Sequence, residues 1–101
     1  RGKNIENTSG KKLLLDADWD KLFHLSNAIH GDFITRIKND FPTLTKHDIE
    51  ICCLLRFGIE HEVLGSIFLT ETDSVTKAKR RMKKRLNLSA SDDLDVFLLK
   101  Y

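Results

Sequence analysis

The sequence predicts an all-α fold of roughly six short helices joined by short connections. Apolar residues recur every three or four positions along most of the chain, which is the period of one face of a helix. No segment alternates apolar and polar residues as a half-buried strand would. With 101 residues, of which 41% are hydrophobic, the chain can form one domain with a modest core.

Residues 1–15 are largely polar at their start and lack a helical period, so we expect a flexible arm or linker there. Residues 16–43 are expected to form a helical extension. Its first helix begins near Asp16, is capped by Asp16 or Asp18, and has one face made of Trp19, Leu22, Phe23, Ser26 and Ile29. Its second helix is capped by Asp32 and carries Phe33, Ile34, Ile37 and Phe41. It ends at Phe41-Pro42, because a residue before proline avoids helical backbone angles.

Residues 44–101 are expected to form a second unit that begins with a capping box. Thr45 and Asp48 have the three-residue spacing of that motif, and the helix that follows stops near Gly58. Its buried face is expected to contain Ile51, Cys52 and Leu55. A short helix within 60–69 presents Val63, Leu64, Ile67 and Phe68. The final helix, capped by Ser91 or Asp92, contains Leu94, Phe97 and Leu98.

The segment 70–86 carries almost all of the positive charge of the chain. It has seven Lys or Arg residues and two acidic residues, giving +5, whereas 1–69 carry −1 and 87–101 carry −2. Thr70 or Thr72 can cap a helix here, with Asp73 as the acidic partner. A narrow apolar stripe contains Val75, Ala78, Met82 and Leu86. A polyanion would be attracted mainly by this helix, although a solvated helix face is the simpler interpretation of any basic run.

A short helix, a tight turn and a basic second helix have the geometry of a helix-turn-helix. The major groove of DNA is wide enough for one α-helix, so a reading helix must be presented with its outer face exposed. The first helix of such a pair holds the second one in place. On this interpretation, the basic residues form a DNA-contacting surface.

A run of matched positions strengthens this interpretation. They are Leu44-Thr45, Asp48, Ile51-Cys52, Leu54-Leu55, Gly58, Leu64-Gly65, Phe68, Ser74-Val75 and Arg85-Leu86. Their order, kept without a gap over 44–86, resembles the LuxR/GerE-type helix-turn-helix. The preceding pattern of Trp19, Phe23, Phe33 and Phe41-Pro42 resembles the extension seen before this domain in regulators from Bacteroidetes-type bacteria. The resemblance implies a C-terminal effector domain of a bacterial transcriptional regulator that binds specific DNA sequences, in the helix-turn-helix superfamily and without a clear wing.

The resemblance also implies a role for individual residues of the recognition helix, 74–86. The positions that face base edges are Thr76, Lys77 and Arg80. The positions expected to contact phosphates are Thr70, Thr72, Ser74, Lys79, Lys83 and Lys84. Arg and Lys can pair with guanine acceptors, and Thr can meet either a thymine methyl group or a polar base edge.

Four residues depart from the pattern of the family: Glu60, Val63, Glu71 and Ala78. The family usually has capping serines at the first and third of these positions, an acidic residue at the second and a histidine at the fourth. These departures leave open an alternative function. In that alternative, the chain is a degenerate helix-turn-helix that acts as a protein-interaction or dimerisation module.

The sequence gives no indication of an enzyme. None of His24, His30, His47 and His61 lies in a catalytic or metal-binding motif, and the chain has neither a glycine-rich phosphate loop nor a nucleophile motif. The adjacent residues Cys52-Cys53 lie in an apolar helical segment and are predicted to be core thiols. A metal site would need more ligands, and neighbours on a helix point in different directions. RNA is a poorer candidate than DNA, because the basic helix lacks interleaved aromatic residues. We therefore expect no cofactor, no metal and no small-molecule substrate.

The expected partners are double-stranded DNA, a second copy of the chain and a sensor domain. The family usually dimerises through its final helix, here Asp92–Tyr101, and the helices within 16–41 are the other candidate surface. The chain begins at Arg1 and has no apolar run near 18 residues. We therefore expect a piece of a longer, cytoplasmic protein whose sensor lies elsewhere, and that parent can itself be membrane-attached.

Overall fold

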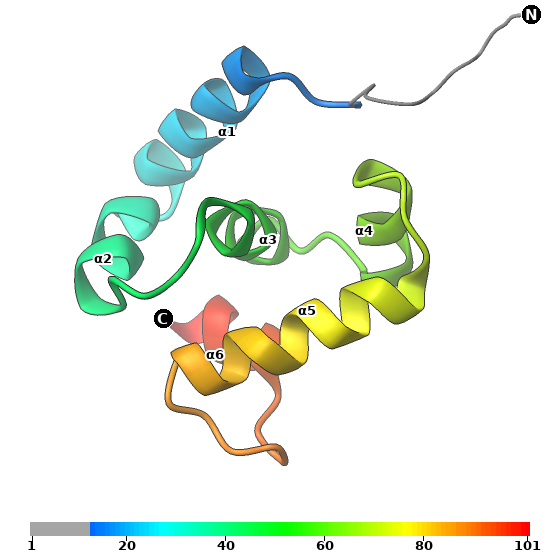
Figure 1. The fold of residues 1–101 in the computed structure, drawn as a ribbon. Coiled ribbons are helices and arrows are strands. Elements are labelled where there is room, and N and C mark those ends of the chain that lie inside the picture. The colour runs from blue at the N-terminus through cyan, green and yellow to red at the C-terminus, as the bar shows by residue number, and fades with distance from the viewer. Residues whose placement is uncertain (1–12) are drawn as a thin grey trace, which may run out of the picture.

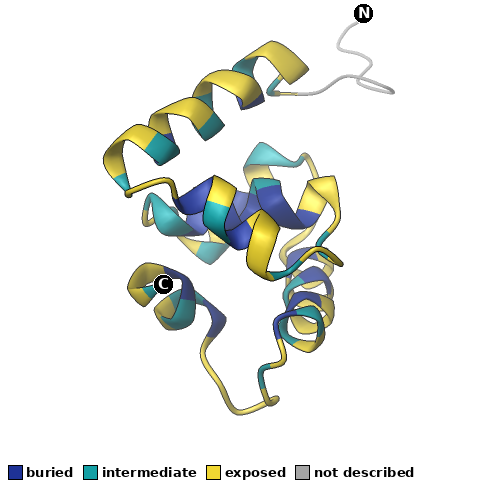
Figure 2. Cartoon of the chain, turned by 90° about the vertical axis from the view of Figure 1, so that its left-hand side faces the viewer, coloured by how far each residue is buried: buried dark blue, intermediate teal, exposed yellow. Residues whose placement is uncertain are grey.

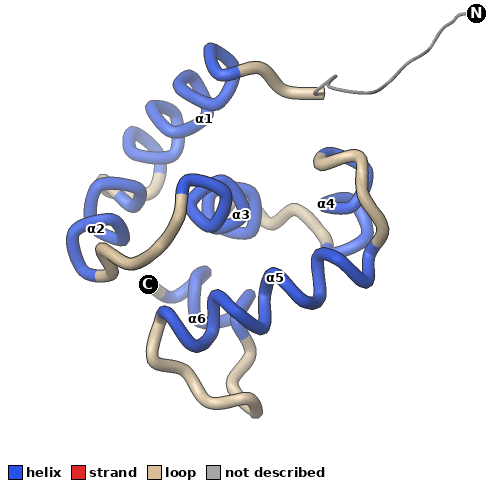
Figure 3. Tube along the Cα trace, in the orientation of Figure 1, coloured by secondary structure: helices blue, strands red, loops and turns tan. Residues whose placement is uncertain are grey.

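The structure, a computed structural model, describes residues 13–101, so most of the predicted arm (1–12) lies outside the described residues. Within this range every regular element is a helix and no strand occurs, which confirms the all-α prediction (Figures 1 and 3). The helices are α1 (Asp16–Ile29), α2 (Phe33–Asp40), α3 (Lys46–Arg56), α4 (His61–Ile67), α5 (Thr72–Arg85) and α6 (Leu94–Lys100).

Helix α3 lies at the centre of the molecule. It contacts α1 and α2 on one side and α6 on another, while α4 packs mainly on α5 (Figure 1). Most of α3 is buried, and Figure 2 shows it as the darkest helix in the interior. The extension formed by α1 and α2 therefore shares one core with the rest of the domain. None of the helices between residues 13 and 101 is long and apolar enough to cross a membrane.

The two cysteines of α3 are free and fully buried, as predicted. Burial raises the pKa of the Cys52 thiol to about 12, with a further contribution from the nearby Asp48 carboxylate. Burial also raises the pKa of the Cys53 thiol to about 12. Because the thiolate is the reactive form, both side chains act as apolar core groups near neutral pH.

The starts of α1 and α2 differ from the prediction. Neither Asp16 nor Asp18 is the N-cap of α1. That position is Leu15, whose N–H donates to the Asp18 carboxylate at 2.9 Å. Asp32 stands at the N-cap of α2 with φ at 59°, and its side chain makes no capping hydrogen bond. The side chain of Asn27 supplies that cap instead.

Asn27 lies in α1 and reaches across the turn to α2. Its Oδ1 accepts from the N–H groups of Ile34 at 2.9 Å and Thr35 at 3.2 Å. On the faces of these helices, Trp19, Phe33, Ile34 and Ile37 are buried as predicted. Ile29 is 60% exposed, so its predicted place on the buried face of α1 is wrong.

The capping box at the start of α3 is confirmed. The Asp48 N–H donates to Thr45 Oγ1 at 3.1 Å, and the Thr45 N–H donates to the Asp48 carboxylate at 2.9 Å. The same carboxylate oxygen accepts from the Arg85 guanidinium at 2.5 Å. Asp48 is only 2% exposed, so this pair links the start of α3 to the last turn of α5 inside the protein.

Helix α4 and the turn after it set the position of α5. Leu64 is fully buried in the core, but Val63 is 41% exposed, so its predicted place on the buried face is wrong. The turn uses a left-handed backbone at Leu69, with φ at 55°, and the Thr70 N–H donates to the Gly65 carbonyl at 2.9 Å. A Cβ atom at Gly65 would lie 3.0 Å from the Thr70 carbonyl oxygen. The absence of a side chain at Gly65 therefore lets the turn close tightly on α4.

Helix α5 begins at Thr72, two residues before the predicted start of the recognition helix, and ends at Arg85. Its N-cap is Glu71, which makes no side-chain capping bond, so capping by Thr70 or Thr72 is wrong. The predicted apolar stripe is confirmed, since each of its residues is at most 4% exposed: Val75, Ala78, Met82 and Leu86.

Helix α6 is capped by Asp93, whose carboxylate accepts from the Val96 N–H at 3.2 Å. The prediction of Ser91 or Asp92 is wrong by one or two residues, and Asp92 instead accepts from the Ser89 N–H at 2.8 Å. The buried face of α6 contains Leu94 and Leu98.

Aromatic residues join the end of α6 to α2. The ring of Phe41 lies 6.4 Å from that of Phe97 and 6.1 Å from that of Tyr101. Arg36 of α2 donates to the Tyr101 backbone oxygen at 3.0 Å, and its guanidinium lies 5.1 Å from the centre of the Tyr101 ring. The extension is thereby attached to the C-terminal residue as well as to α3.

Candidate nucleic-acid interface

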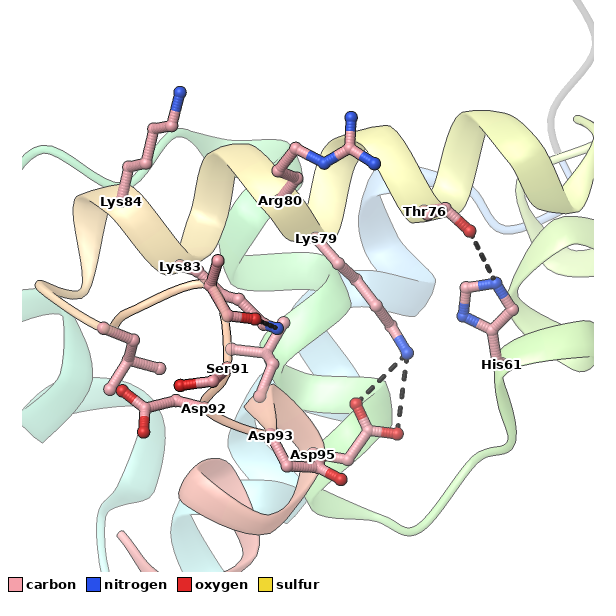
Figure 4. Close-up of a pocket in the computed structure, with 13 residues that line it drawn as sticks. His61, Thr76, Lys79, Arg80, Lys83, Lys84, Ser91, Asp92, Asp93 and Asp95 are labelled. Carbon is pink, nitrogen blue, oxygen red and sulfur yellow. Dashed lines mark hydrogen bonds and ion pairs between the residues drawn. The ribbon is translucent and has the colours of Figure 1, made fainter.

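One stripe of α5 faces away from the protein. Its residues follow each other at spacings of four, three and four, which places them on a single helix face: Asp73, Lys77, Arg80 and Lys84. All of them are exposed, whereas the apolar stripe on the opposite face is buried. Figure 4 shows Arg80 and Lys84 extending outward from α5. Lys77 and Arg80, predicted to contact bases, therefore lie on the face that a groove of DNA could approach.

Lys77 pairs with Asp73 along this stripe at 3.5 Å. Both side chains are well exposed, at 65% and 77%. An exposed pair of this spacing on a helix is worth only about 0.3–0.5 kcal/mol. Lys77 can therefore exchange this partner for a DNA acceptor at little cost. Within the described residues Arg80 and Lys84 form no ion pair.

A groove runs along one flank of α5, between this helix and the segment that leads into α6 (Figure 4). Lys79 reaches across it to Asp95 at 3.1 Å, and the Lys79 side chain is only 14% exposed. Lys83 donates to the Ala90 carbonyl at 3.2 Å. These two predicted phosphate contacts are thus turned toward the protein, where Lys79 links α5 to α6 itself and Lys83 links α5 to the segment before α6.

The remaining predicted phosphate contacts gather at the start of α5. They are exposed, and they line a shallow surface with Gly65 and Ser66: Thr70, Thr72 and Ser74. Glu62, Glu71 and Asp73 line the same surface. Carboxylates repel phosphate, so this end of α5 is less favourable to a DNA backbone than its basic C-terminal half.

Thr76 lies where the exposed stripe meets the groove. Its hydroxyl donates to the Thr72 carbonyl at 3.1 Å, and it lies 3.2 Å from His61 Nε2 at the start of α4 (Figure 4). Lys79, Arg80 and His61 line the groove beside it. Of the three predicted base-contacting residues, Thr76 is thus the one that α4 holds directly.

Three residues near this surface were not singled out as contacts from the sequence. Arg81 is exposed, and within residues 13–101 it has no ion-pair partner. Arg85 binds the buried carboxylate of Asp48, and His61 binds Thr76. The last two act through partners 37 and 15 residues away in the chain, so no short motif could indicate them. The run of basic residues alone could have indicated Arg81.

The part of the chain that is described offers no candidate metal centre. No group of three or more His, Cys, Asp or Glu side chains there is arranged to hold a metal ion. Comparison of the chain with models of known families, with curated proteins and with solved structures finds no match. The geometry and charge of α5 are therefore the features from which a function can be inferred.

Proposed function

We propose that this chain is a sequence-specific DNA-binding domain of the LuxR/GerE helix-turn-helix type, the C-terminal effector domain of a bacterial transcriptional regulator. In this proposal α4 is the scaffold helix and α5 is the recognition helix. The domain works in the cytoplasm, under the control of a sensor domain elsewhere in a longer parent chain.

The observation that carries the proposal is the two-sided character of α5. Its apolar face is buried in the core, while Lys77, Arg80 and Lys84 are exposed on the opposite face. Figure 4 shows Arg80 and Lys84 extending outward. The major groove accepts a helix presented in this way, and Lys or Arg can pair with guanine O6 and N7. The short turn at Leu69–Glu71 and the close contact at Gly65 fix the angle between α4 and α5. A fixed angle is needed if the same side chains are to meet the same base positions each time.

The direct test is to bind the protein to fragmented genomic DNA from a Bacteroidetes-type bacterium and to sequence what is retained. We expect enrichment of a short motif, and we expect the double variant Lys77→Ala/Arg80→Ala to lose that enrichment. Weak binding that is alike for both proteins and present only at low salt would mean that the charge merely attracts phosphates. That outcome would refute sequence-specific recognition.

A protein-interaction module is the alternative, and the acidic start of α5 favours it. Glu62, Glu71 and Asp73 surround the helix start where DNA-binding helices usually approach the backbone. Isothermal titration with DNA decides between the two, because a module that binds only a protein partner gives no sequence-dependent heat with any duplex.

A single recognition helix reads only a few base pairs, so we expect two copies on one operator. Two surfaces are available. On α6, Val96 and Leu99 are 43% and 46% exposed, and on α1, Leu25 and Ile29 are 47% and 60% exposed. Analytical ultracentrifugation with operator DNA should give two protomers for each site. One protomer per site would contradict the homodimer.

A further inference from the structure

The hydroxyl of Thr76 is already engaged inside the protein. A threonine hydroxyl has one hydrogen and two lone pairs. The hydrogen is donated to the Thr72 carbonyl, four residues earlier in α5. The hydroxyl oxygen therefore acts as the acceptor toward His61 Nε2, which must carry a hydrogen for that bond to form. The hydroxyl has no hydrogen left to donate to a base acceptor.

The methyl group is the part of Thr76 that remains without an intramolecular polar role. The residue is exposed, and it lies beside Arg80 at the edge of the outward stripe. Two hydrogen bonds from different elements fix the side-chain torsion, since α5 supplies one partner and α4 supplies the other. A threonine held in this way presents a fixed methyl group.

We propose that Thr76 reads the C5-methyl group of a thymine, and that His61 is the positioning residue that holds Thr76 for this contact. The inference rests on the proposed DNA-binding function and narrows it to one base at one position. Thymine is the only base that carries a methyl group in the major groove, so apolar contact with that group distinguishes it from the other three.

The experiment uses the enriched operator with each thymidine replaced in turn by deoxyuridine, which removes only the methyl group. Dissociation constants are measured by fluorescence anisotropy at fixed salt. For the wild-type protein we expect one thymidine per half-site whose replacement weakens binding about three- to fivefold, the effect of one buried methyl group. If no such position exists, the thymine contact is refuted. The enriched motif, and the proposed function that it supports, would still stand. If no motif is enriched, the proposed function itself fails first.

Two substitutions at Thr76 distinguish the contribution of its methyl group to thymine recognition from that of its hydroxyl. Thr76→Val keeps a methyl group in the same place without His61, because valine in a helix strongly prefers one side-chain rotamer whereas threonine populates two. It should therefore retain the three- to fivefold discrimination between thymidine and deoxyuridine. Thr76→Ser keeps the hydroxyl and should lose that discrimination. The opposite result, with loss in the valine variant and retention in the serine variant, would show that the hydroxyl makes the contact and would overturn the proposal.

The role of His61 has its own test. In His61→Ala, the dissociation constants for the thymidine and deoxyuridine operators should become nearly equal. The salt dependence of binding and the melting temperature should stay close to those of the wild type. His61→Gln, whose amide can still donate to Thr76, should restore part of it. Unchanged discrimination in His61→Ala would refute the positioning role. A large fall in melting temperature, with binding weakened equally on the thymidine and deoxyuridine operators, would mean that His61 only stabilises the fold.

Discussion

The buried carboxylate of Asp48 joins two parts of the chain that the sequence keeps far apart. It accepts from the Thr45 N–H at the start of α3 and from the Arg85 guanidinium at the end of α5. The Asp48 side chain is 3% exposed and that of Arg85 is 32% exposed. A buried carboxylate that loses its cation is left poorly compensated, which makes this pair important for the position of α5.

Arg85→Ala should therefore lower the free energy of unfolding by about 2–3 kcal/mol, which is below the full cost for a buried pair because Arg85 is partly exposed. Urea denaturation followed by circular dichroism measures this. Arg81→Ala is the matched control: it removes the same charge from an exposed side chain of the same helix and should change stability by less than about 0.5 kcal/mol. Equal effects in the two variants would show that the Asp48–Arg85 pair contributes little.

His30 should make stability depend on pH. Burial, and then the nearby Arg56 charge, lower the pKa of His30 from its usual 6.5. Below pH 6.5 the unfolded chain therefore binds a proton at His30 more readily than the folded protein does. The free energy of unfolding should fall as the pH drops below 6.5. Its pH dependence should be weaker in His30→Gln, while His24→Gln, at an exposed site of the preceding helix α1, should behave like the wild type. A His30→Gln variant with the full pH dependence would contradict this assignment.

At the scale of the helices, the start of α2 depends on a residue of α1. Asn27 accepts from two N–H groups of α2 that have no partner within that helix. Asn27→Ala should cost about 1 kcal/mol of stability, the usual value of an N-cap. Asn27→Asp, which keeps the acceptor, should cost less. Asn39→Ala, at an exposed position of α2, is the control and should be nearly neutral. If Asn27→Ala is also neutral, the cap does not hold the α1–α2 turn.

The sequence predicts well which segments are helical, because helical periodicity and capping motifs depend on residues within one or two turns of each other. The stripe of Val75, Ala78 and Met82 and the capping box of Thr45 and Asp48 were predicted for that reason. The cap from Asn27 was missed, since it comes from a neighbouring helix. Val63 fits the helical period but is exposed, because a short helix such as α4 buries only a narrow face against α5.

At the scale of the whole molecule, the extension (α1 and α2) is in direct contact with the end of α6. Arg36 and Phe41 of the α2 region contact Tyr101, so α1 and α2 are part of the same packed body as α6. A movement imposed on the extension would therefore reach α6, and from there Lys79 of α5 through Asp95. In the proposed regulator, a signal from a sensor domain would use this physical connection.

The candidate surface was only partly predictable from the sequence. The basic run indicates that α5 is charged, but it does not indicate which charges are free. Lys79 binds Asp95 of α6 and Lys83 binds the Ala90 carbonyl before α6, whereas Arg80 and Lys84 project outward (Figure 4). That division depends on the path of residues 87–93, which carry no helical period. Only the folded structure distinguishes cations that stabilise the protein from cations that can meet DNA.

The central claim is that the outward stripe of α5 reads DNA sequence, and a charge-matched comparison on the enriched operator tests it most directly. Lys77→Ala/Arg80→Ala and Lys21→Ala/Lys100→Ala both remove two positive charges from exposed positions, but only the first pair lies on α5. We predict that the first variant loses at least about tenfold of the preference for the operator over a scrambled duplex, while the second keeps that preference. Equal losses in the two variants would contradict the claim, because they would show that net charge rather than the α5 surface governs binding.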